Sequence, residues 1–142
     1  MSDHNAPVPR QLPALEPETR FFWQSGADGR LRILRCGSCG HYQHPPWPRC
    51  PRCGSEQVAP VVVSGRGRIK TYTVNVQPWV RGLEKPFVYA AVELDEQPEL
   101  FVFTNILAPI EAVRSGMPVQ VTFEQREDVY LPLFRPIEDV RA

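Results

Sequence analysis

Two C-x-x-C motifs constrain what this chain can fold into more than any other feature of the sequence. Cys36 and Cys39 form the first motif, Cys50 and Cys53 form the second, and a glycine follows each of them. Four thiolates that converge from two short turns are the ligand set of a tetrahedral zinc site. Because four sulfurs complete the coordination shell, the ion has no open position for a reacting water. The motifs therefore predict a structural Zn²⁺ in a zinc ribbon.

Other uses of the same segment fit the sequence less well. Paired disulfides are typical of secreted chains, whereas the N-terminal residues contain prolines where a signal peptide would have its apolar run. His41 and His44 lie between the motifs, but a complete set of four cysteines needs neither as a ligand. Trp47, between Pro46 and Pro48, is expected to pack on the ribbon rather than to bind a ligand.

Length, hydropathy and charge limit the classes of protein to consider. With 142 residues, 42% of them hydrophobic, the chain is long enough for two small modules with apolar cores. No apolar stretch is long enough to span a bilayer, so we expect a soluble, cytoplasmic protein without membrane contact. The 16 Lys and Arg balance the 16 Asp and Glu, which argues against non-specific nucleic-acid binding. Basic residues dominate between Gly29 and Lys70, and acidic residues dominate after Val92.

Four parts follow one another along the chain. The first is rich in proline and too poor in apolar residues to fold alone. The second begins with a helix, expected over residues 18–25, that carries Phe21, Phe22 and Trp23. Either two of these rings cap the zinc module, or the helix offers an apolar surface to a partner. The expected boundaries are 1–17 for a flexible arm, 18–57 for the helix and zinc ribbon, 58–136 for an OB-fold and 137–142 for a C-terminal tail.

Beyond residue 57 apolar and polar residues alternate with period two, and β-forming side chains are frequent. Gly65 and Gly67 are expected at a bulge or sharp corner. A helical turn over 110–115 falls near the place where an OB-fold often has a helix between its third and fourth strands. The sequence thus predicts a mainly β protein whose second module is a five-stranded Greek-key barrel, the OB-fold. The expected strands cover residues 61–64, 68–76, 87–94, 100–107 and 118–125.

Several short motifs, taken in this order, resemble those of a known family. They are Phe22-Trp23, the strand from Leu31 to Arg35, both cysteine motifs with the approach from Pro45 to Cys50, Ser64 to Gly67, Val92 to Leu94, Gly116 to Val119 and Leu131 to Pro136. The family is that of the thiolase-associated proteins that join a rubredoxin-like zinc ribbon to an OB-fold, formerly known only as a domain of unknown function. The resemblance implies an accessory subunit that works on acyl-CoA with a thiolase-like or lipid-transfer-protein-like catalytic partner. The implied reaction is carbon–carbon bond cleavage or formation, of thiolase or retro-aldol type.

Residue chemistry agrees with such a helper role. A thiolase-type reaction needs a nucleophilic cysteine with a base, but all four cysteines of this chain are assigned to metal. None of the serines considered lies in a nucleophile-elbow sequence. We therefore predict no catalytic residue and expect that the chain is not catalytic alone. The proline-rich arm, the aromatic helix and the tail from Tyr130 to Ala142 are the segments expected to dock the partner.

Basic residues are the candidates for contact with coenzyme A, because the planar donors of arginine match its phosphates. Arg66, Arg68 and Lys70 alternate along one expected strand and so share a face. Arg81 lies in the loop that follows, together with Trp79, whose indole is a stacking surface for adenine. The alternative is that these charges are ordinary solvated side chains and that Trp79 closes the barrel mouth.

Two further classes of function stay open. OB-folds and zinc ribbons both occur in proteins that bind single-stranded nucleic acid, and Tyr72, Trp79, Phe87 and Tyr89 are side chains on which bases stack. The acidic second half of the barrel disfavours that class. The other class is a purely structural subunit that never contacts substrate. It predicts that mutation of the arginines named above leaves the acyl-CoA affinity of the complex unchanged.

Overall fold

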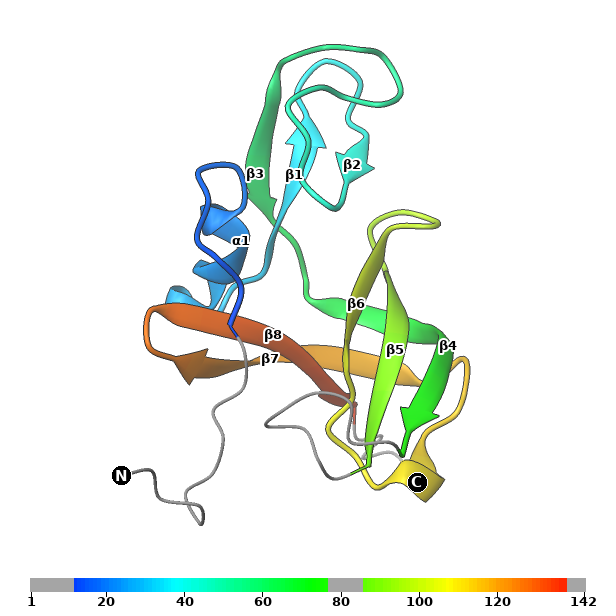
Figure 1. Ribbon diagram of the computed structural model, residues 1–142. Coiled ribbons are helices and arrows are strands. Elements are labelled where there is room, and N and C mark those ends of the chain that lie inside the picture. Colours follow the sequence, from blue (N-terminus) through cyan, green and yellow to red (C-terminus); the bar gives the residue numbers. More distant parts are fainter. Residues whose placement is uncertain (1–11, 77–85, 138–142) are drawn as a thin grey trace, which may run out of the picture.

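The computed structural model describes residues 12–76 and 86–137 and consists mostly of β-structure. One short helix precedes two antiparallel sheets, of which the first has strand order β2-β1-β3 and the second β6-β5-β4-β7-β8 (Figure 1). Within the described ranges, no helix is long and apolar enough to cross a membrane. The elements are α1 (Arg20–Trp23), η1 (Ser25–Asp28), β1 (Arg32–Cys36), β2 (Tyr42–Gln43), β3 (Val58–Val62), β4 (Arg66–Asn75), β5 (Phe87–Leu94), β6 (Phe101–Asn105), η2 (Ile110–Ala112), β7 (Pro118–Arg126) and β8 (Val129–Pro136).

The three-stranded sheet forms the zinc ribbon. Its central strand β1 leads directly into the first cysteine motif, and Ile33 on this strand is fully buried, as the sequence pattern indicated. One strand prediction was wrong, because residues 61–64 do not begin the barrel. Val61 instead lies opposite Ile33 in the ribbon sheet, so β3 continues this sheet past the division expected at residue 58. The apolar run around Val61 fits either sheet, and only the pairing with β1 decides between them.

The five-stranded sheet closes into the predicted OB-fold barrel. Strand β4 is its first strand, and the 3-10 turn η2 lies between its third and fourth strands, where the sequence predicted a helical turn. Ile106, just after β6, forms a parallel bridge with Phe134 of β8. The amide of Leu107 donates to the carbonyl oxygen of Phe134 at 2.8 Å. These contacts join the two ends of the sheet order, so the barrel has a closed core around Phe134.

Strand β8 is the barrel strand that sequence analysis missed. Residues 131–134 are all buried, so this strand lacks the alternation that marks a strand with one exposed face. Leu131 and Leu133 pack with Leu12, Leu15 and Trp23 on one side, whereas Phe134 belongs to the main barrel core. The segment from residue 130 to residue 136 therefore belongs to strand β8, with residues 131–134 buried, and is not the free docking tail expected from the sequence.

The glycines expected at a sharp corner lie at the start of the barrel. Gly65 has a φ of +76°, and a Cβ atom on Gly67 would lie 2.4 Å from the carbonyl oxygen of Glu93. Both positions therefore need glycine, one for its backbone conformation and one for the close approach of β5. The register shift itself lies further along β4, between Ile69 and Thr71.

The aromatic helix packs where the ribbon meets the barrel. Phe22 is buried, and Phe21 and Trp23 are half-buried against the core clusters. The packing of Phe22 with Ile33 and His44 of the ribbon fits the expectation that rings of this helix cover the zinc module. That the helix offers an apolar surface to a partner stays a prediction. The helix is also shorter than expected: α1 ends at Trp23, and the 3-10 turn η1 follows.

The loop between β5 and β6 fastens the barrel to the ribbon. The side-chain amide of Gln97 donates to the carbonyl oxygen of Tyr42 at 2.9 Å and accepts the amide N–H of Tyr42 at 2.9 Å. A carboxylate oxygen of Glu96 accepts the amide N–H of Ser64 at 2.8 Å. Gln97 thus pairs with the backbone of β2 much as a neighbouring strand would. Since ribbon residues such as Ile33 also belong to the main apolar cluster, the two modules form one packed unit.

Candidate metal centre and ligand surfaces

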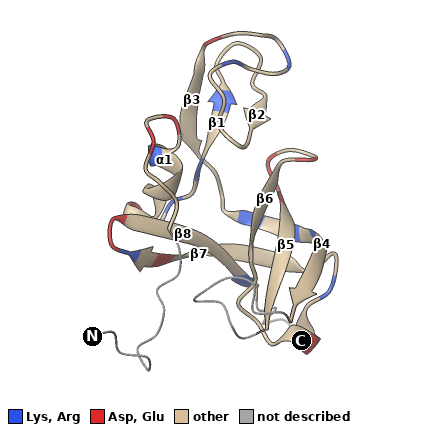
Figure 2. Ribbon diagram, in the orientation of Figure 1, with Lys and Arg blue, Asp and Glu red and all other residues tan. Residues whose placement is uncertain are grey.

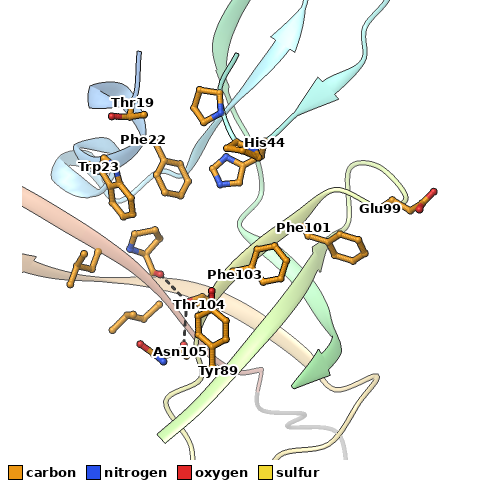
Figure 3. A pocket seen from close by; sticks show the side chains of 15 residues that line it. Thr19, Phe22, Trp23, His44, Tyr89, Glu99, Phe101, Phe103, Thr104 and Asn105 are labelled. Atoms are coloured by element: carbon orange, nitrogen blue, oxygen red, sulfur yellow. Dashed lines mark hydrogen bonds between the residues drawn. The ribbon is translucent and has the colours of Figure 1, made fainter. Parts of the chain in front are cut away.

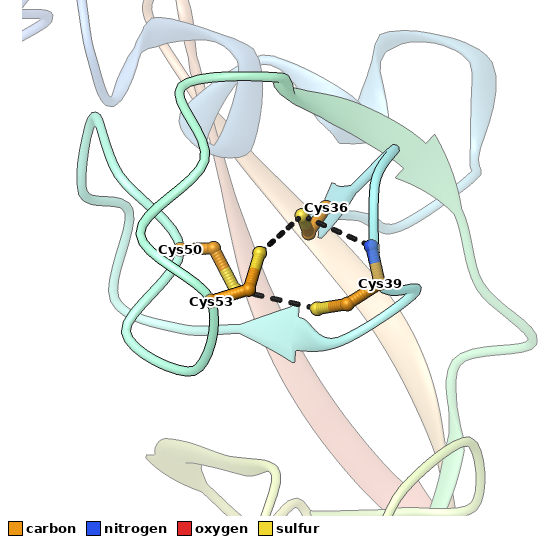
Figure 4. Close-up of side chains that lie close together, drawn as sticks. All are labelled: Cys36, Cys39, Cys50 and Cys53. Atoms are coloured by element: carbon orange, nitrogen blue, oxygen red, sulfur yellow. Dashed lines mark hydrogen bonds between the residues drawn. The ribbon is translucent and has the colours of Figure 1, made fainter.

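The four cysteines come together at the tip of the ribbon (Figure 4). All four sulfur atoms lie within 4.8 Å of one another. The Sγ atoms of Cys36 and Cys53 are 3.6 Å apart, and those of Cys39 and Cys50 are also 3.6 Å apart. Four sulfurs at about 2.3 Å from a tetrahedral zinc ion would be separated by about 3.8 Å. The sulfur positions therefore fit one Zn²⁺, which when bound would cross-link the two loops.

Backbone amides donate hydrogen bonds to two of the four cysteine sulfurs. The amides of Ser38 and Cys39 donate to the sulfur of Cys36 at 3.3 and 3.4 Å, and the amide of Arg52 donates to that of Cys50 at 3.4 Å. The Cys39 amide in particular lowers the pKa of Cys36 from 9.0 to about 6. Each turn ends at a glycine with positive φ, and the amides of Gly40 and Gly54 donate to the carbonyl oxygens of Cys36 and Cys50, both at 2.9 Å. The two turns thus place four sulfur atoms in the arrangement that structural zinc requires.

The two histidines of the intervening loop lie outside this ligand set, as expected. The imidazole of His44 packs against the ring of Phe22, with 4.6 Å between ring centroids. Burial lowers the pKa of His44 to about 4, so its ring is neutral at physiological pH. Its role in this fold is therefore packing at the junction between ribbon and helix.

The residues predicted to contact coenzyme A are only partly within the described structure. Arg66, Arg68 and Lys70 are all exposed on β4, where they alternate with buried residues. The side chain of Arg66 donates to Gln120 at 3.2 Å, and that of Arg68 donates to the carbonyl oxygen of Gly116 at 3.0 Å. The other two predicted residues, Trp79 and Arg81, lie outside the described residues. The shared face is thus present, and contact with coenzyme A stays a prediction.

A second surface was missed by sequence analysis. Helix α1, the turn after His44 and strands β5, β6 and β8 enclose a largely apolar cavity of about 520 Å³ (Figure 3). Trp23 and Phe101 line it, and Tyr89 and Phe103 stack on each other at 6.2 Å along its barrel side. The aromatic residues were visible in the sequence, but no motif indicates that these five segments meet.

Trp47 is a correction to the sequence analysis. The sequence predicted that it packs on the ribbon, yet the residue is 66% exposed. It stands at the edge of a groove of about 750 Å³ between the start of α1 and the ribbon sheet. Pro46 and Pro48 flank Trp47 and restrict the backbone of the loop that carries the indole.

Comparison with known protein families identifies the two modules. Residues 23–59 match the family described as "ChsH2, rubredoxin-like zinc ribbon domain", and residues 60–124 match "ChsH2, C-terminal OB-fold domain". In a solved structure named "Ltp2-ChsH2(DUF35) aldolase", one chain is 34% identical, with a TM-score of 0.79 over 88% of this chain and 98% of that one. This protein belongs to the ChsH2 family. The resemblance inferred from the sequence motifs is thereby confirmed, because this family carries the DUF35 designation.

Other relatives differ from this chain in length and in sequence identity. A DUF35 protein of unknown function from Sulfolobus solfataricus is 13% identical, with a TM-score of 0.60 over 85% of this chain and 86% of that one, which shows the shared fold alone. A "Probable enoyl-CoA hydratase alpha subunit" from Thermomonospora curvata is 36% identical over 89% of this chain. A "3-oxo-4,17-pregnadiene-20-carboxyl-CoA hydratase alpha subunit" from Mycobacterium tuberculosis is 35% identical over 89%. The chain spans 40% of the length of each of these two curated relatives.

Proposed function

We propose that this protein is the accessory subunit of a complex that acts on an acyl-CoA, with a thiolase-superfamily or lipid-transfer-protein-like catalytic partner. The observation that carries the proposal is the match to the ChsH2 chain of an aldolase named for two components, at 34% identity over 98% of that chain. Two curated relatives are named as alpha subunits of CoA-substrate hydratases, which supports both the substrate class and the subunit role.

The chemistry of this chain supports a helper role. Its four cysteines together form the zinc site, so no thiol is left as an acyl-carrying nucleophile. A shell of four sulfurs also leaves the zinc without an open position for substrate. The partner therefore supplies the reacting groups, for carbon–carbon bond cleavage or formation of thiolase or retro-aldol type. Thiolates that serve as metal ligands fit a reducing compartment, so we place the complex in the cytoplasm.

Contact with the CoA moiety belongs to the same proposal. Arg66, Arg68 and Lys70 are exposed on one strand, and none of them forms an ion pair with the described residues. Arg66 and Arg68 each use one donor within the barrel, on Gln120 and on the carbonyl oxygen of Gly116. Their remaining donors and the ammonium group of Lys70 would meet the phosphates of CoA, with Trp79 and Arg81 as further contacts. Glu93 and Asp95 lie beside Arg68 and reduce the attraction of this surface for a long polyanion. This arrangement favours a small anionic ligand over single-stranded nucleic acid.

Turnover assays with separate and combined subunits test the proposal. The chain and a thiolase-superfamily protein of the same organism are purified alone and together. Each sample receives a 3-hydroxyacyl-CoA, for which retro-aldol cleavage between C2 and C3 gives a carbonyl compound and a shorter acyl-CoA. A second reaction supplies a 3-oxoacyl-CoA with free CoA, for which thiolysis gives two acyl-CoAs. We expect no turnover by this chain alone and faster turnover by the complex than by the partner. Equal rates with and without the chain would refute the proposal.

A further inference from the structure

The seam between β6 and β8 is closed at one end of the barrel and open at the other. At the closed end Ile106 forms its parallel bridge with Phe134, and the Leu107 amide donates to the carbonyl oxygen of Phe134 at 2.8 Å. On β6 itself, the buried hydroxyl of Thr104 donates to the carbonyl oxygen of Pro132 at 2.9 Å (Figure 3). Apart from that single bridge, no ladder of backbone pairs joins β6 to β8 within the described residues. The cavity of about 520 Å³ lies at the open part of the seam and is lined by residues of both strands.

Backbone groups of β6 face this opening. The Ile106 amide, just after β6, donates to the carbonyl oxygen of Val88 on β5 at 3.3 Å. Because the backbone groups of successive residues in a strand point to opposite sides, the even-numbered residues of β6 bond to β5 and the odd-numbered residues face the seam. Pro132 across the seam has no N–H to donate, and the amides and carbonyl oxygens of Phe101 and Phe103 form no hydrogen bond with the described residues. Unpaired groups of this kind at the edge of a sheet are a template for a further strand.

The side chains around the opening are largely apolar, and two aromatic rings among them are exposed. Phe103 is 63% exposed and stacks with Tyr89, which is 46% exposed, at 6.2 Å between ring centroids. Trp23 lines the cavity from α1, and Leu131 and Leu133 line it from β8. Exposed apolar surface with large aromatic residues is typical of protein–protein contact sites. A strand that paired with β6 would lay alternate side chains against this apolar lining.

Charge at the rim of the opening indicates a further property of such a strand. Glu99 is the only charged residue among the described residues that line the cavity, because His44 is neutral. The Glu99 carboxylate forms no ion pair with the part of the chain that the structure describes. Asp95 and Glu96 lie in the same turn between β5 and β6, where Figure 2 shows acidic residues and no basic one. A segment with a Lys or Arg beside Glu99 therefore matches this rim.

Other occupants satisfy these features less well. An acyl chain would fill apolar space but has no groups to pair with the backbone of Phe101 and Phe103. Residues 1–11 contain Pro7 and Pro9, which lack the amide that strand pairing needs. A second copy of β6 brings no basic residue to Glu99, because residues 100–107 contain neither Lys nor Arg. An extended segment of a different protein, with apolar side chains and a basic residue, meets all of these requirements.

We propose that the catalytic partner adds an extended, apolar segment to the free edge of β6 in this opening, with a basic residue of that segment beside Glu99. The inference rests on the proposed function for the existence of that partner and adds where and how the partner binds. The tail around residue 130, expected from the sequence to dock the partner, instead contributes Leu131 and Leu133 to the wall of the opening as part of β8.

Single substitutions in the zinc-loaded chain test the strand edge against the same thiolase-superfamily protein by biolayer interferometry. Phe103→Ala removes the exposed ring and is expected to weaken binding by about 30-fold, as for an aromatic residue at the centre of an interface. Phe103→Pro also removes the amide that faces the opening, while the hydrogen bonds to β5 stay, because edge strands accept proline. It is expected to bind about fivefold more weakly than Phe103→Ala, the factor for one lost hydrogen bond. Glu99→Lys is expected to weaken binding most strongly at low salt.

Two matched controls lie elsewhere in the chain. Trp47→Ala removes an aromatic ring of similar exposure, 66%, that does not line the cavity. Glu127→Lys makes the same change of charge as Glu99→Lys, and both glutamates lie in exposed turns with positive φ. Both controls are expected to bind as the wild type does. Zinc content and melting temperature of each variant confirm that the fold is intact.

Hydrogen exchange at single amides, compared between the free chain and the complex, measures strand addition directly. The amides of Phe101 and Phe103 are expected to exchange at least about 100-fold more slowly in the complex. The Val102 amide faces β5 and is expected to exchange slowly in both samples.

The outcomes separate the strand edge from the proposed function. If the wild-type chain binds and both Phe103 variants bind equally well, the edge is wrong and the accessory role stands. Equal affinities of Phe103→Ala and Phe103→Pro, both below that of the wild type, would mean contact through the ring without an added strand and overturn the inference. Loss of binding in Trp47→Ala alone would place the partner on the ribbon and overturn it as well. If the wild-type chain fails to bind at all, both proposals fail.

The remaining outcomes concern other occupants of the edge. Self-association of the wild-type chain that disappears in Phe103→Pro would assign the edge to a second copy of the chain and overturn the inference. Slow exchange at Phe101 and Phe103 in the free chain that becomes fast when residues 1–11 are removed would assign the edge to those residues and overturn it too.

Discussion

Replacement of Gln97 by alanine is expected to loosen the ribbon from the barrel without unfolding either. Gln97 makes two hydrogen bonds to the backbone of Tyr42, one as donor and one as acceptor, both at 2.9 Å. Each hydrogen bond of this kind contributes about 1 kcal/mol net, so the pair contributes about 2 kcal/mol. These two bonds oppose only the local separation of β2 from the loop between β5 and β6, so their loss lowers the free energy of that opening by about 2 kcal/mol. It therefore increases the population of a locally opened state by about 30-fold.

Hydrogen–deuterium exchange, followed by NMR on the zinc-loaded protein, measures this opening. The Tyr42 amide is expected to exchange about 30-fold faster in Gln97→Ala than in the wild type, which is the factor that corresponds to a loss of about 2 kcal/mol in the free energy of opening. Gln97→Glu keeps the oxygen that accepts the Tyr42 amide but lacks the donor, so its effect should be about half as large in free energy. Gln125→Ala is the matched control, because the Gln125 amide donates to the nearby carbonyl oxygen of Glu127 and not to the ribbon. Unchanged exchange at Tyr42 in Gln97→Ala would refute the reasoning.

Three further results are expected. A thiol-modifying reagent should release zinc stoichiometrically from the wild type, and the ribbon amides should then lose their protection from hydrogen exchange. Cys39→Ser should be purified with little zinc. Full zinc retention by this variant in elemental analysis would contradict the site. Stability should fall as pH decreases from 6.5 to 4, by up to about 3 kcal/mol, because the unfolded chain binds a proton at His44 that the folded chain with its pKa of about 4 does not. Urea titrations of His44→Phe should lack this part of the decline, and equal pH profiles for the two proteins would exclude His44 as its source. Gly67→Ala should lower stability by about 1–3 kcal/mol in thermal unfolding, since its Cβ would meet a backbone oxygen; Gly37→Ala, whose nearest contact is 3.4 Å, should cost less, and equal losses would contradict the packing argument.

The metal site and the fold class could be predicted because their signals are local. The spacing of Cys36 and Cys39, and its repetition, specifies four converging sulfurs whatever surrounds them. Period-two alternation on β5, with buried Val88, Ala90 and Val92, likewise reports a strand with one face in the core. These patterns depend on neighbours a few residues apart, so they can be read without knowledge of the tertiary structure.

The rest depends on contacts between segments that lie far apart in the sequence. Strand β8 was missed because Leu12, Leu15 and Trp23 cover the face that would otherwise be exposed, so Leu131 and Leu133 show no alternation with polar residues. Val61 and Val62 were assigned to the wrong sheet because the partner strand, and not the strand's own composition, decides its place. The position of Trp47 depends on the hydrogen bonds from Gln43, which no pattern in the sequence reveals.

The central claim is that this chain works as a stable subunit beside a catalytic partner. Its most direct test is co-expression with the thiolase-superfamily protein of the same organism, followed by size-exclusion chromatography with light scattering and zinc analysis of the peak. The account predicts one complex in which both proteins co-elute at a fixed ratio, with one zinc ion for each copy of this chain. A chain that elutes alone at its monomer mass of 16.2 kDa, and that shifts a single-stranded oligonucleotide instead, would contradict it.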